Sequence, residues 1–315
     1  MRKYFYLALA PFFLTSCPGP DPVDPEPEPY VTDSLVVNEA SNALLFETTG
    51  TWCQYCPNGT ATMRRIINQY NTDHARIIGF ASHTGDALET PLQTALNALF
   101  TASGVPNFYV NNDDAGQQVD GPVGVALAAE PVVGAAHVWH ENATGDSVIV
   151  DIKVQFFDDE NLSNYFVQSY LLVSDIEARE YNLGGIPIDL NQTSSVNWMT
   201  KGSGNTPTTW AVTDSAVGVT AGDIVTHDHI PFTMGSTENP YGVPLDSINP
   251  LGTSFFDGDI FGSKYTPIQI KIDKSALSAI AGIPHSLSVA TLIWKPATDG
   301  SQTMWYVNGY VDLHH

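Results

Sequence analysis

The chain has 315 residues, of which 43% are apolar, so it is long enough for more than one domain and apolar enough to build ordinary cores. Its 12 basic and 34 acidic residues give a formal net charge of −22. This charge argues against a nucleic-acid partner, because neutralising phosphates requires lysine and arginine.

The first residues have the pattern of an export signal. Met1-Arg2-Lys3 is positively charged, and residues 4–14 form an apolar run too short to span a bilayer. The run ends in Leu14-Thr15-Ser16-Cys17, which looks like the lipobox of a bacterial lipoprotein. We therefore expect residues 1–16 to be a cleaved signal peptide and Cys17 to be the acylated membrane anchor. The alternative is an ordinary signal peptide followed by a chance cysteine.

Residues 17–33 are expected to form a tether. Proline and acidic residues alternate from Pro18 to Pro29, a composition that cannot pack and favours an extended chain of about 3 Å per residue. A plain spacer is the favoured interpretation. Some Bacteroidetes lipoproteins use acidic residues after the acylated cysteine as a signal for export to the cell surface, so both the periplasmic and the surface face stay open.

Strands and helices are expected to alternate between residues 34 and 130. Apolar runs predict strands, and apolar positions at helical spacing predict helices. The expected strands cover 43–47, 76–81 and 107–111, and the expected helices cover 56–70, 91–102 and 123–129. This order predicts an α/β domain with a mixed sheet over residues 34–130.

The pattern changes after Pro131. Residues 147–156 alternate between apolar and polar side chains, which is typical of a strand with one buried face. Further strands are expected at 167–174, 223–233, 287–295 and 304–311, with a single candidate helix at 275–281 and long polar loops at 184–208 and 235–264. Residues 131–315 are therefore expected to form an antiparallel, immunoglobulin-like β-sandwich domain.

Cysteine carries the clearest chemical signal. If Cys17 is acylated, Cys53 and Cys56 are the only two of the three cysteines that can pair within the chain. They belong to Trp52-Cys53-Gln54-Tyr55-Cys56-Pro57, between an expected strand and an expected helix. A helix N-terminus favours a thiolate and so lowers the pKa of Cys53. A zinc site would need two further ligands at suitable spacing, which the sequence does not offer, so we expect no metal and no cofactor.

Two other positions fit the same pattern. Glu47 lies six residues before Cys53, an offset at which thioredoxins place a buried acid that relays a proton for the second cysteine. Val105-Pro106 precedes the third strand, where thioredoxin folds have a cis-proline that orients a bound substrate chain. The resemblance implies that Cys53, Cys56 and Glu47 are catalytic. It also implies that Trp52, Val105 and Pro106 contact the substrate.

The whole chain resembles the Bacteroidetes outer-membrane lipoprotein family named after a 28-kDa outer-membrane protein. The resemblance lies in residues 45–57, 104–110 and 226–230. It implies a thioredoxin-like first domain, a β-sandwich second domain and an outer-membrane location, but no defined substrate. Gln54-Tyr55 replaces the Gly-Pro of thioredoxins between the cysteines, which leaves open whether the pair oxidises, isomerises or reduces.

Two functions follow as alternatives. The first is thiol–disulfide exchange with exported proteins through Cys53 and Cys56. The second is a non-catalytic binding or adhesion lipoprotein at the outer membrane, in which the fold is a scaffold and the cysteines form a local disulfide. Partial exposure of Cys53 beside Pro106 with a low thiol pKa would favour the first, and a buried, unreactive disulfide the second.

Two weaker signals lie elsewhere. His227 and His229 alternate on an expected strand, so both imidazoles are expected on one face, more in keeping with a half-buried strand face than with a metal site. Four Asp-Ser-apolar tripeptides match the loose Bacteroidetes pattern for O-glycosylation, at residues 33–35, 146–148, 214–216 and 246–248.

Overall fold

The computed structural model describes residues 30–72, 74–192, 199–201, 210–212, 223–224, 226–235, 241–298 and 303–312. The expected signal peptide, the expected lipid attachment site at Cys17 and residues 18–29 of the expected tether lie outside the described residues. The chain divides into two units at residue 30, and residues 31–315 contain all the elements described below. A further division of the second unit at residue 130 stays a prediction.

The described part of the chain is mostly β-sheet with few helices. Its first sheet is mixed and has the strand order β2-β1-β3-β4, with β1 and β2 parallel and the other pairs antiparallel. These strands are β1 (Ala43–Thr49), β2 (Ile77–His83), β3 (Asn107–Val110) and β4 (Asp113–Gly116). The helices are α1 (Cys56–Tyr70), α2 (Pro91–Leu99) and α3 (Asp120–Ala128).

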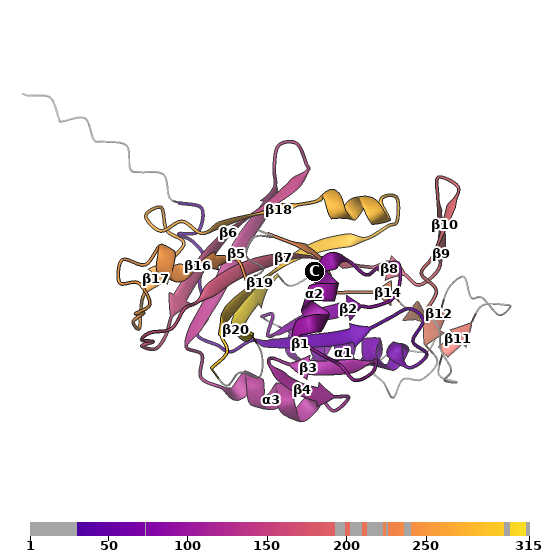
Figure 1. The fold of residues 1–315 in the computed structure, drawn as a ribbon, viewed down its shortest axis with the longest axis horizontal. Coiled ribbons are helices and arrows are strands. Elements are labelled where there is room, and N and C mark those ends of the chain that lie inside the picture. The colour runs from indigo at the N-terminus through magenta and orange to yellow at the C-terminus, as the bar shows by residue number, and fades with distance from the viewer. Residues whose placement is uncertain are drawn as a thin grey trace, which may run out of the picture. The chain divides into compact units, whose positions relative to one another are not determined.

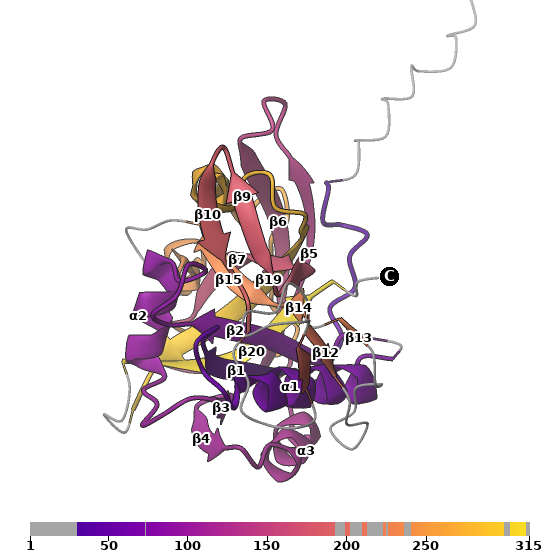
Figure 2. The ribbon, with the colours of Figure 1, turned by 90° about the vertical axis from the view of Figure 1, so that its right-hand side faces the viewer.

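Both faces of this first sheet are covered, which explains why β1 and β2 are buried along their whole length. On one face, Ala43 and Leu45 of β1 pack with Met63 and Ile66 of α1. The segment that leads into α3 packs on the same face, and α2 packs on the opposite one. In Figure 2, α1 and α3 lie to the right of the labels of β1 to β4, and α2 lies to their left.

Two antiparallel sheets follow in the sequence. One has β15 (Ile230–Met234), β7 (Phe166–Ser174), β19 (Ser286–Pro296) and β20 (Met304–Val311) in that order, with β16 (Val243–Pro244) also paired to β7. The other has β6 (Ser147–Phe156) paired with β5 (Val133–Glu141), β17 (Ile260–Phe261) and β18 (Gln269–Asp273). Their facing side chains form one apolar core, and Figure 1 shows the strands of the two sheets in adjacent layers.

The sheet that contains β7 is buried on both faces. Val167 and Leu171 point into the core shared with β6, whereas Tyr170 and Leu172 pack against the first sheet. Trp294 of β19 is also buried on the side of the first sheet. The three sheets therefore stack, and the first sheet shares a core with the second part of the chain.

Short elements connect the layers. They are β8 (Ile176–Glu177) paired with β14 (Thr226–His227), the hairpin of β9 (Glu180–Leu183) and β10 (Ile186–Asp189), and a small sheet of β11 (Met199–Lys201), β12 (Trp210–Val212) and β13 (Asp223–Ile224). Two 3-10 helices, η2 (Leu245–Ser247) and η3 (Ser275–Ile280), complete the set. The segment that was expected to be helical at 275–281 thus forms a 3-10 turn.

The structure corrects the expected strand over 223–233. It is broken into β13, β14 and β15, because the backbone turns between β14 and β15, where His229 adopts a left-handed φ of 58°. His227 and His229 therefore do not alternate on one strand. His227 belongs to β14 and is buried, whereas His229 lies in the bend beside β2 and its carbonyl oxygen accepts the Ala81 N–H.

Candidate functional site

Cys53 and Cys56 form a disulfide with their Cα atoms 5.4 Å apart. Cys56 is the first residue of α1, and Pro57 follows in its first turn, where a missing N–H costs nothing. That first turn has no acidic residue, so the positive end of the helix dipole is not offset by a carboxylate of the helix itself. Both cysteines are buried, with Cys53 4% and Cys56 0% exposed.

The turn that carries Cys53 is held by its neighbours in the fold. The exposed Trp52 donates its indole N–H to the Thr84 carbonyl oxygen at 2.7 Å. Gly50 allows this arrangement, because a Cβ there would lie 2.7 Å from the indole nitrogen. Tyr55, on the other side of Cys53, is as exposed as Trp52. Each cysteine is therefore preceded in the sequence by an exposed aromatic residue.

Val105 and Pro106 lie against this disulfide. The Cys53 sulfur is 3.6 Å from the Val105 carbonyl oxygen, and the Val105–Pro106 peptide bond is cis. Pro106 is buried against α1, since a Cβ on Gly59 would lie 2.9 Å from the Pro106 Cβ. The residues expected to contact a substrate, Trp52, Val105 and Pro106, thus lie around the Cys53 side of the pair.

Glu47 lies on β1, on the face that α1 covers. Its side chain is 1% exposed, and neither carboxyl oxygen has a hydrogen-bond partner among the described residues. Burial raises the pKa of Glu47 from 4.5 to about 8, although the Thr49 side chain partly offsets the rise. Gly59 of α1 approaches so closely that a Cβ there would collide with a Glu47 oxygen. The carboxyl therefore lies under the first turns of α1, the helix that begins at Cys56.

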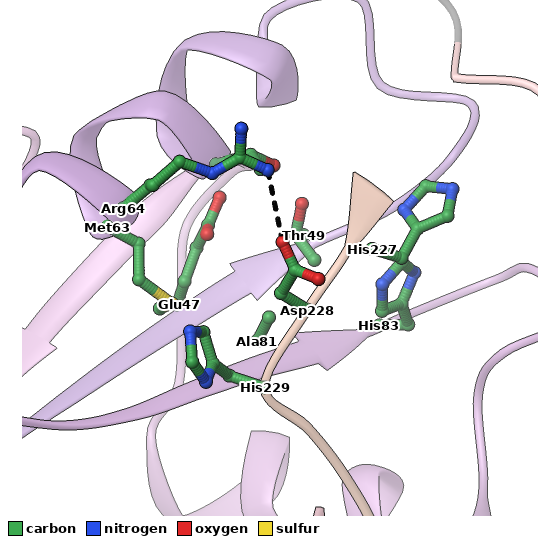
Figure 3. A pocket seen from close by; sticks show the side chains of 10 residues that line it. Glu47, Thr49, Met63, Arg64, Ala81, His83, His227, Asp228 and His229 are labelled. Carbon is green, nitrogen blue, oxygen red and sulfur yellow. Dashed lines mark hydrogen bonds and ion pairs between the residues drawn. The ribbon is translucent and has the colours of Figure 1, made fainter. Parts of the chain in front are cut away.

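A narrow cavity of about 20 Å³, room for roughly one water molecule, lies beside this carboxyl (Figure 3). Its lining combines β1, β2 and α1 with the segment that leads into β15, and consists of Glu47, Thr49, Thr60, Met63, Arg64, Ala81, His83, His227, Asp228 and His229. Arg64 and Asp228 form an ion pair at 3.1 Å across it, and both side chains are partly exposed. The buried carboxyl thus lies close to polar groups that reach the solvent.

Asp86, in the loop that follows β2, fixes the turn before Cys53. Its carboxylate accepts the Thr51 N–H at 2.7 Å, the Leu88 N–H at 2.9 Å and the Nδ1–H of His83 at 2.8 Å. Burial by itself would raise the pKa of Asp86, but the His83 hydrogen bond and charge and the two backbone donors outweigh it and lower the pKa to about 2. Asp86 is thus held as a carboxylate.

Gln192 holds the same turn from the second part of the chain. Its Nε2 donates to the carbonyl oxygens of Gly50, Thr51 and Cys53. Nearby, the His227 ring lies edge-on to the His83 ring at 5.2 Å and its Nε2 donates to the Leu190 carbonyl oxygen. Burial, helped by the charge of His83, lowers the pKa of His227 to about 4, so the ring is neutral.

The sequence interpretation missed Asp86, Arg64, Gln192 and Asp228. Asp86 could have been found from the sequence, because it follows an expected strand and the neighbouring Gly85. Polar residues at the ends of strands often line functional sites. For Gln192 no local signal exists, because its partners are far away in the sequence. Asp228 lies in the segment 226–230 that was already singled out and accepts the Thr226 hydroxyl, but its ion pair with Arg64 joins distant residues. No three His, Cys, Asp or Glu side chains of the described residues gather as a metal site would need. None of the described helices is long and apolar enough to cross a membrane.

Comparisons with known proteins find a similar fold in a solved structure, but no matching sequence. No family model and no curated protein sequence matches the chain. A solved structure, HBP35 of Porphyromonas gingivalis, has a similar fold with a TM-score of 0.51 and 13% sequence identity. The similarity covers 87% of this chain and 76% of that chain. It supports the β-rich architecture described above.

Proposed function

We propose that residues 34–130 are a thioredoxin-like domain and that the chain catalyses thiol–disulfide exchange with exported proteins. One observation carries the proposal. Three groups come together around the start of α1: the Cys53–Cys56 disulfide, the Val105 carbonyl oxygen 3.6 Å from the Cys53 sulfur, and the buried carboxyl of Glu47, which like Pro106 closely approaches Gly59. A buried acid whose pKa is about 8 can both accept and release a proton near neutral pH.

In the reducing direction, the Cys53 thiolate attacks a substrate disulfide. A Cys53–substrate mixed disulfide forms, and the first substrate sulfur leaves as a thiolate. Glu47 then takes the proton of the Cys56 thiol, and the Cys56 thiolate attacks the Cys53 sulfur. This step restores the Cys53–Cys56 bond and releases the second substrate thiolate. The reverse sequence oxidises a substrate dithiol, and Glu47 returns the proton to Cys56.

The exposed surface around Cys53 suits a polypeptide substrate. Trp52 and Tyr55 directly precede the two cysteines in the sequence with more than half of each side chain exposed, and the Val105 backbone carbonyl beside Cys53 is a hydrogen-bond acceptor for an extended chain. The substrates in this proposal are thiols and disulfides of exported proteins.

The proposed location is the outer membrane, with the chain anchored through a lipid on Cys17 and held off the bilayer by residues 18–29, since Thr32 of the expected tether is buried and hydrogen-bonded to the Gly262 carbonyl oxygen. The lipobox pattern and the export signal support it. The fold neighbour, from a species of the Bacteroidetes, is consistent with the expected origin. Fatty-acid labelling of the wild type and of Cys17→Ala tests the anchor, since only the wild type should take up label.

A second function, a non-catalytic binding lipoprotein, is favoured by one observation. Cys53 is only 4% exposed and Cys56 is fully buried, so access to the disulfide is narrow. In that case the disulfide would stabilise the turn and take no part in exchange.

A trapping experiment separates the two functions. In Cys56→Ser the resolving thiol is absent, so mixed disulfides between Cys53 and substrate proteins should accumulate and disappear on treatment with dithiothreitol. Cys53→Ser/Cys56→Ser is the matched control and should trap nothing. If Cys56→Ser forms no adducts, and the wild type neither reduces insulin nor oxidises a dithiol peptide, the exchange proposal fails and the binding function stands.

A further inference from the structure

Gln192 lies directly behind the turn that carries Cys53. Its side chain is 2% exposed, and its Nε2 donates to three carbonyl oxygens of one turn. The distances are 3.2 Å to Gly50, 3.2 Å to Thr51 and 2.9 Å to Cys53. An amide nitrogen has two hydrogens, so the three bonds share them. These contacts link residues separated by 139 to 142 positions in the sequence.

Three carbonyl oxygens that converge on one point create a negative potential there. A thiolate on Cys53 is disfavoured by such a potential, and the effect is large in a buried site because solvent does not screen it. The amide hydrogens of Gln192 supply the opposite partial charge. Gln192 therefore stabilises the turn in both redox states and favours the charged sulfur of the reduced state.

The backbone next to Gln192 is itself fixed. The Leu190 N–H donates to the Arg179 carbonyl oxygen at 3.1 Å, and the Leu190 carbonyl oxygen accepts from His227 Nε2 at 3.0 Å. The Leu190 side chain is buried in an apolar cluster with Ile176 and Ile230. The second part of the chain thus presents the Gln192 amide from a supported position, as a positioning residue requires.

We propose that Gln192 is a positioning residue for the Cys53–Cys56 couple, which lowers the thiol pKa of Cys53 and shifts the couple toward the dithiol. The inference deepens the proposed exchange function and rests on it for its biological meaning. The second part of the chain would then tune the redox chemistry of the first.

The test is the equilibrium of the couple with glutathione. Two glutathione thiols become one glutathione disulfide, while the Cys53–Cys56 bond breaks and each sulfur gains one electron and one proton. In Gln192→Leu, which keeps much of the side-chain volume but has no donor, we expect the equilibrium to move about tenfold toward the protein disulfide, or about 30 mV for a two-electron couple. The pH dependence of iodoacetamide alkylation should show a raised Cys53 thiol pKa.

Gln168→Leu is the matched control. Gln168 is also a fully buried glutamine of the second part of the chain, but its amide oxygen accepts the Ser169 N–H within β7. It should lower the stability and leave the glutathione equilibrium unchanged. An unchanged equilibrium and thiol pKa in a folded Gln192→Leu would overturn the inference, and so would an equal shift in Gln168→Leu.

Two measurements keep the test decisive. If Gln192→Leu does not fold, Gln192→Asn, whose shorter amide is withdrawn from the three carbonyls, should show the same direction of shift, and no shift overturns the inference. The same alkylation titration of the wild type gives the Cys53 thiol pKa against which each variant is compared, and equal values in the wild type and a folded Gln192→Asn overturn it. A Cys56→Ser protein that traps no substrate, together with a shifted equilibrium in Gln192→Leu, would refute the exchange function and leave the role of Gln192 intact.

Discussion

Glu47 and Asp86 are both buried carboxyl groups of the first sheet region, yet their surroundings differ. Asp86 accepts hydrogen bonds from two backbone N–H groups and from His83. Glu47 has no partner for either oxygen among the described residues. The pKa of Asp86 is lowered to about 2, and that of Glu47 is raised to about 8. Burial acts on both in the same direction, so the donors decide which carboxyl carries a charge.

This difference separates two roles around one disulfide. Asp86 stays negatively charged and accepts the Thr51 N–H, which holds the turn at Thr51 next to the end of β2. We therefore expect Asp86 to stabilise the folded state. Glu47 lacks such donors apart from the minor influence of the Thr49 side chain, so its carboxyl does not anchor the fold in the same way and its proposed role is to exchange a proton. Replacing each carboxyl in turn tests whether the two groups have these different roles.

Glu47→Gln should have the largest effect, and it should be a gain. Between pH 4.5 and about 8 the folded state keeps a proton on Glu47 that the unfolded state has released, so wild-type stability falls as pH rises through this window, by up to about 1.4 kcal/mol per pH unit. The neutral glutamine removes this slope. At pH 8 the variant should be more stable than the wild type by about 4 kcal/mol, and at pH 5 by less than about 1 kcal/mol.

Urea unfolding of the oxidised proteins at pH 5 and pH 8 measures both values. Glu130→Gln is the control, because Glu130 is exposed and its replacement should leave the pH slope as in the wild type. A Glu47→Gln protein that keeps the wild-type slope would show that the Glu47 carboxyl is charged when folded and would remove the proton-carrier role.

Asp86→Ala should have the second-largest effect, and it should be a loss. It leaves the Thr51 and Leu88 N–H groups and the His83 ring without their acceptor, at a cost of about 3 kcal/mol at pH 7. Because the folded pKa of Asp86 is lowered, the wild type has this stabilisation above pH 3.8 and loses it as pH falls toward about 2.

Asp120→Ala is the matched control in denaturant unfolding. Asp120 also receives two hydrogen bonds, from the Arg65 guanidinium at 2.7 and 2.9 Å, but the pair lies in solvent. Its loss should cost at most about 0.5 kcal/mol. Equal losses in the two variants would mean that the donors around Asp86 do not form the anchor described here.

The parts of the site that the sequence predicted are those with a local signature. The disulfide, the preceding strand and the helix that begins at Cys56 lie within one short stretch, and the helix over 56–70 was predicted with the bounds it has. Gln192 and the Arg64–Asp228 ion pair could not be found this way, because the groups that they join lie more than a hundred positions apart. Pairing over such distances depends on the tertiary fold.

The same reasoning applies to the strands. β6 was predicted with correct bounds because one of its faces is fully apolar. β5 was missed, since small residues such as Ala135 and Ala136 give a weak periodic signal. β18 was missed although Ile270 and Ile272 alternate with exposed neighbours, a signal that was present in the sequence. The bend at His229 falls in the polar run Thr226 to His229, and His is one of the residue types that adopt a positive φ more readily than most, a signal that the expected continuous strand overlooked.

Gly59→Ala should change the stability least of the three variants. It tests the contact between α1 and the Glu47 carboxyl that the helix covers. In an ordinary helix an added Cβ stabilises by up to about 1 kcal/mol. At Gly59 the Cβ would collide with a Glu47 oxygen and lie 2.9 Å from the Pro106 Cβ, and such overpacking costs about 1–3 kcal/mol. We expect a net loss of about 1–2 kcal/mol in thermal or denaturant unfolding.

Gly124→Ala in α3 is the control, because a Cβ there meets nothing within 4 Å and should stabilise. The two variants thus differ in sign, although both place alanine in a helix. In a Glu47→Ala background the collision with the carboxyl is gone, and Gly59→Ala should cost less than in the wild type. If the cost is the same in both backgrounds, the close approach to Pro106 alone excludes a side chain at Gly59, and the carboxyl of Glu47 has room to move away from α1.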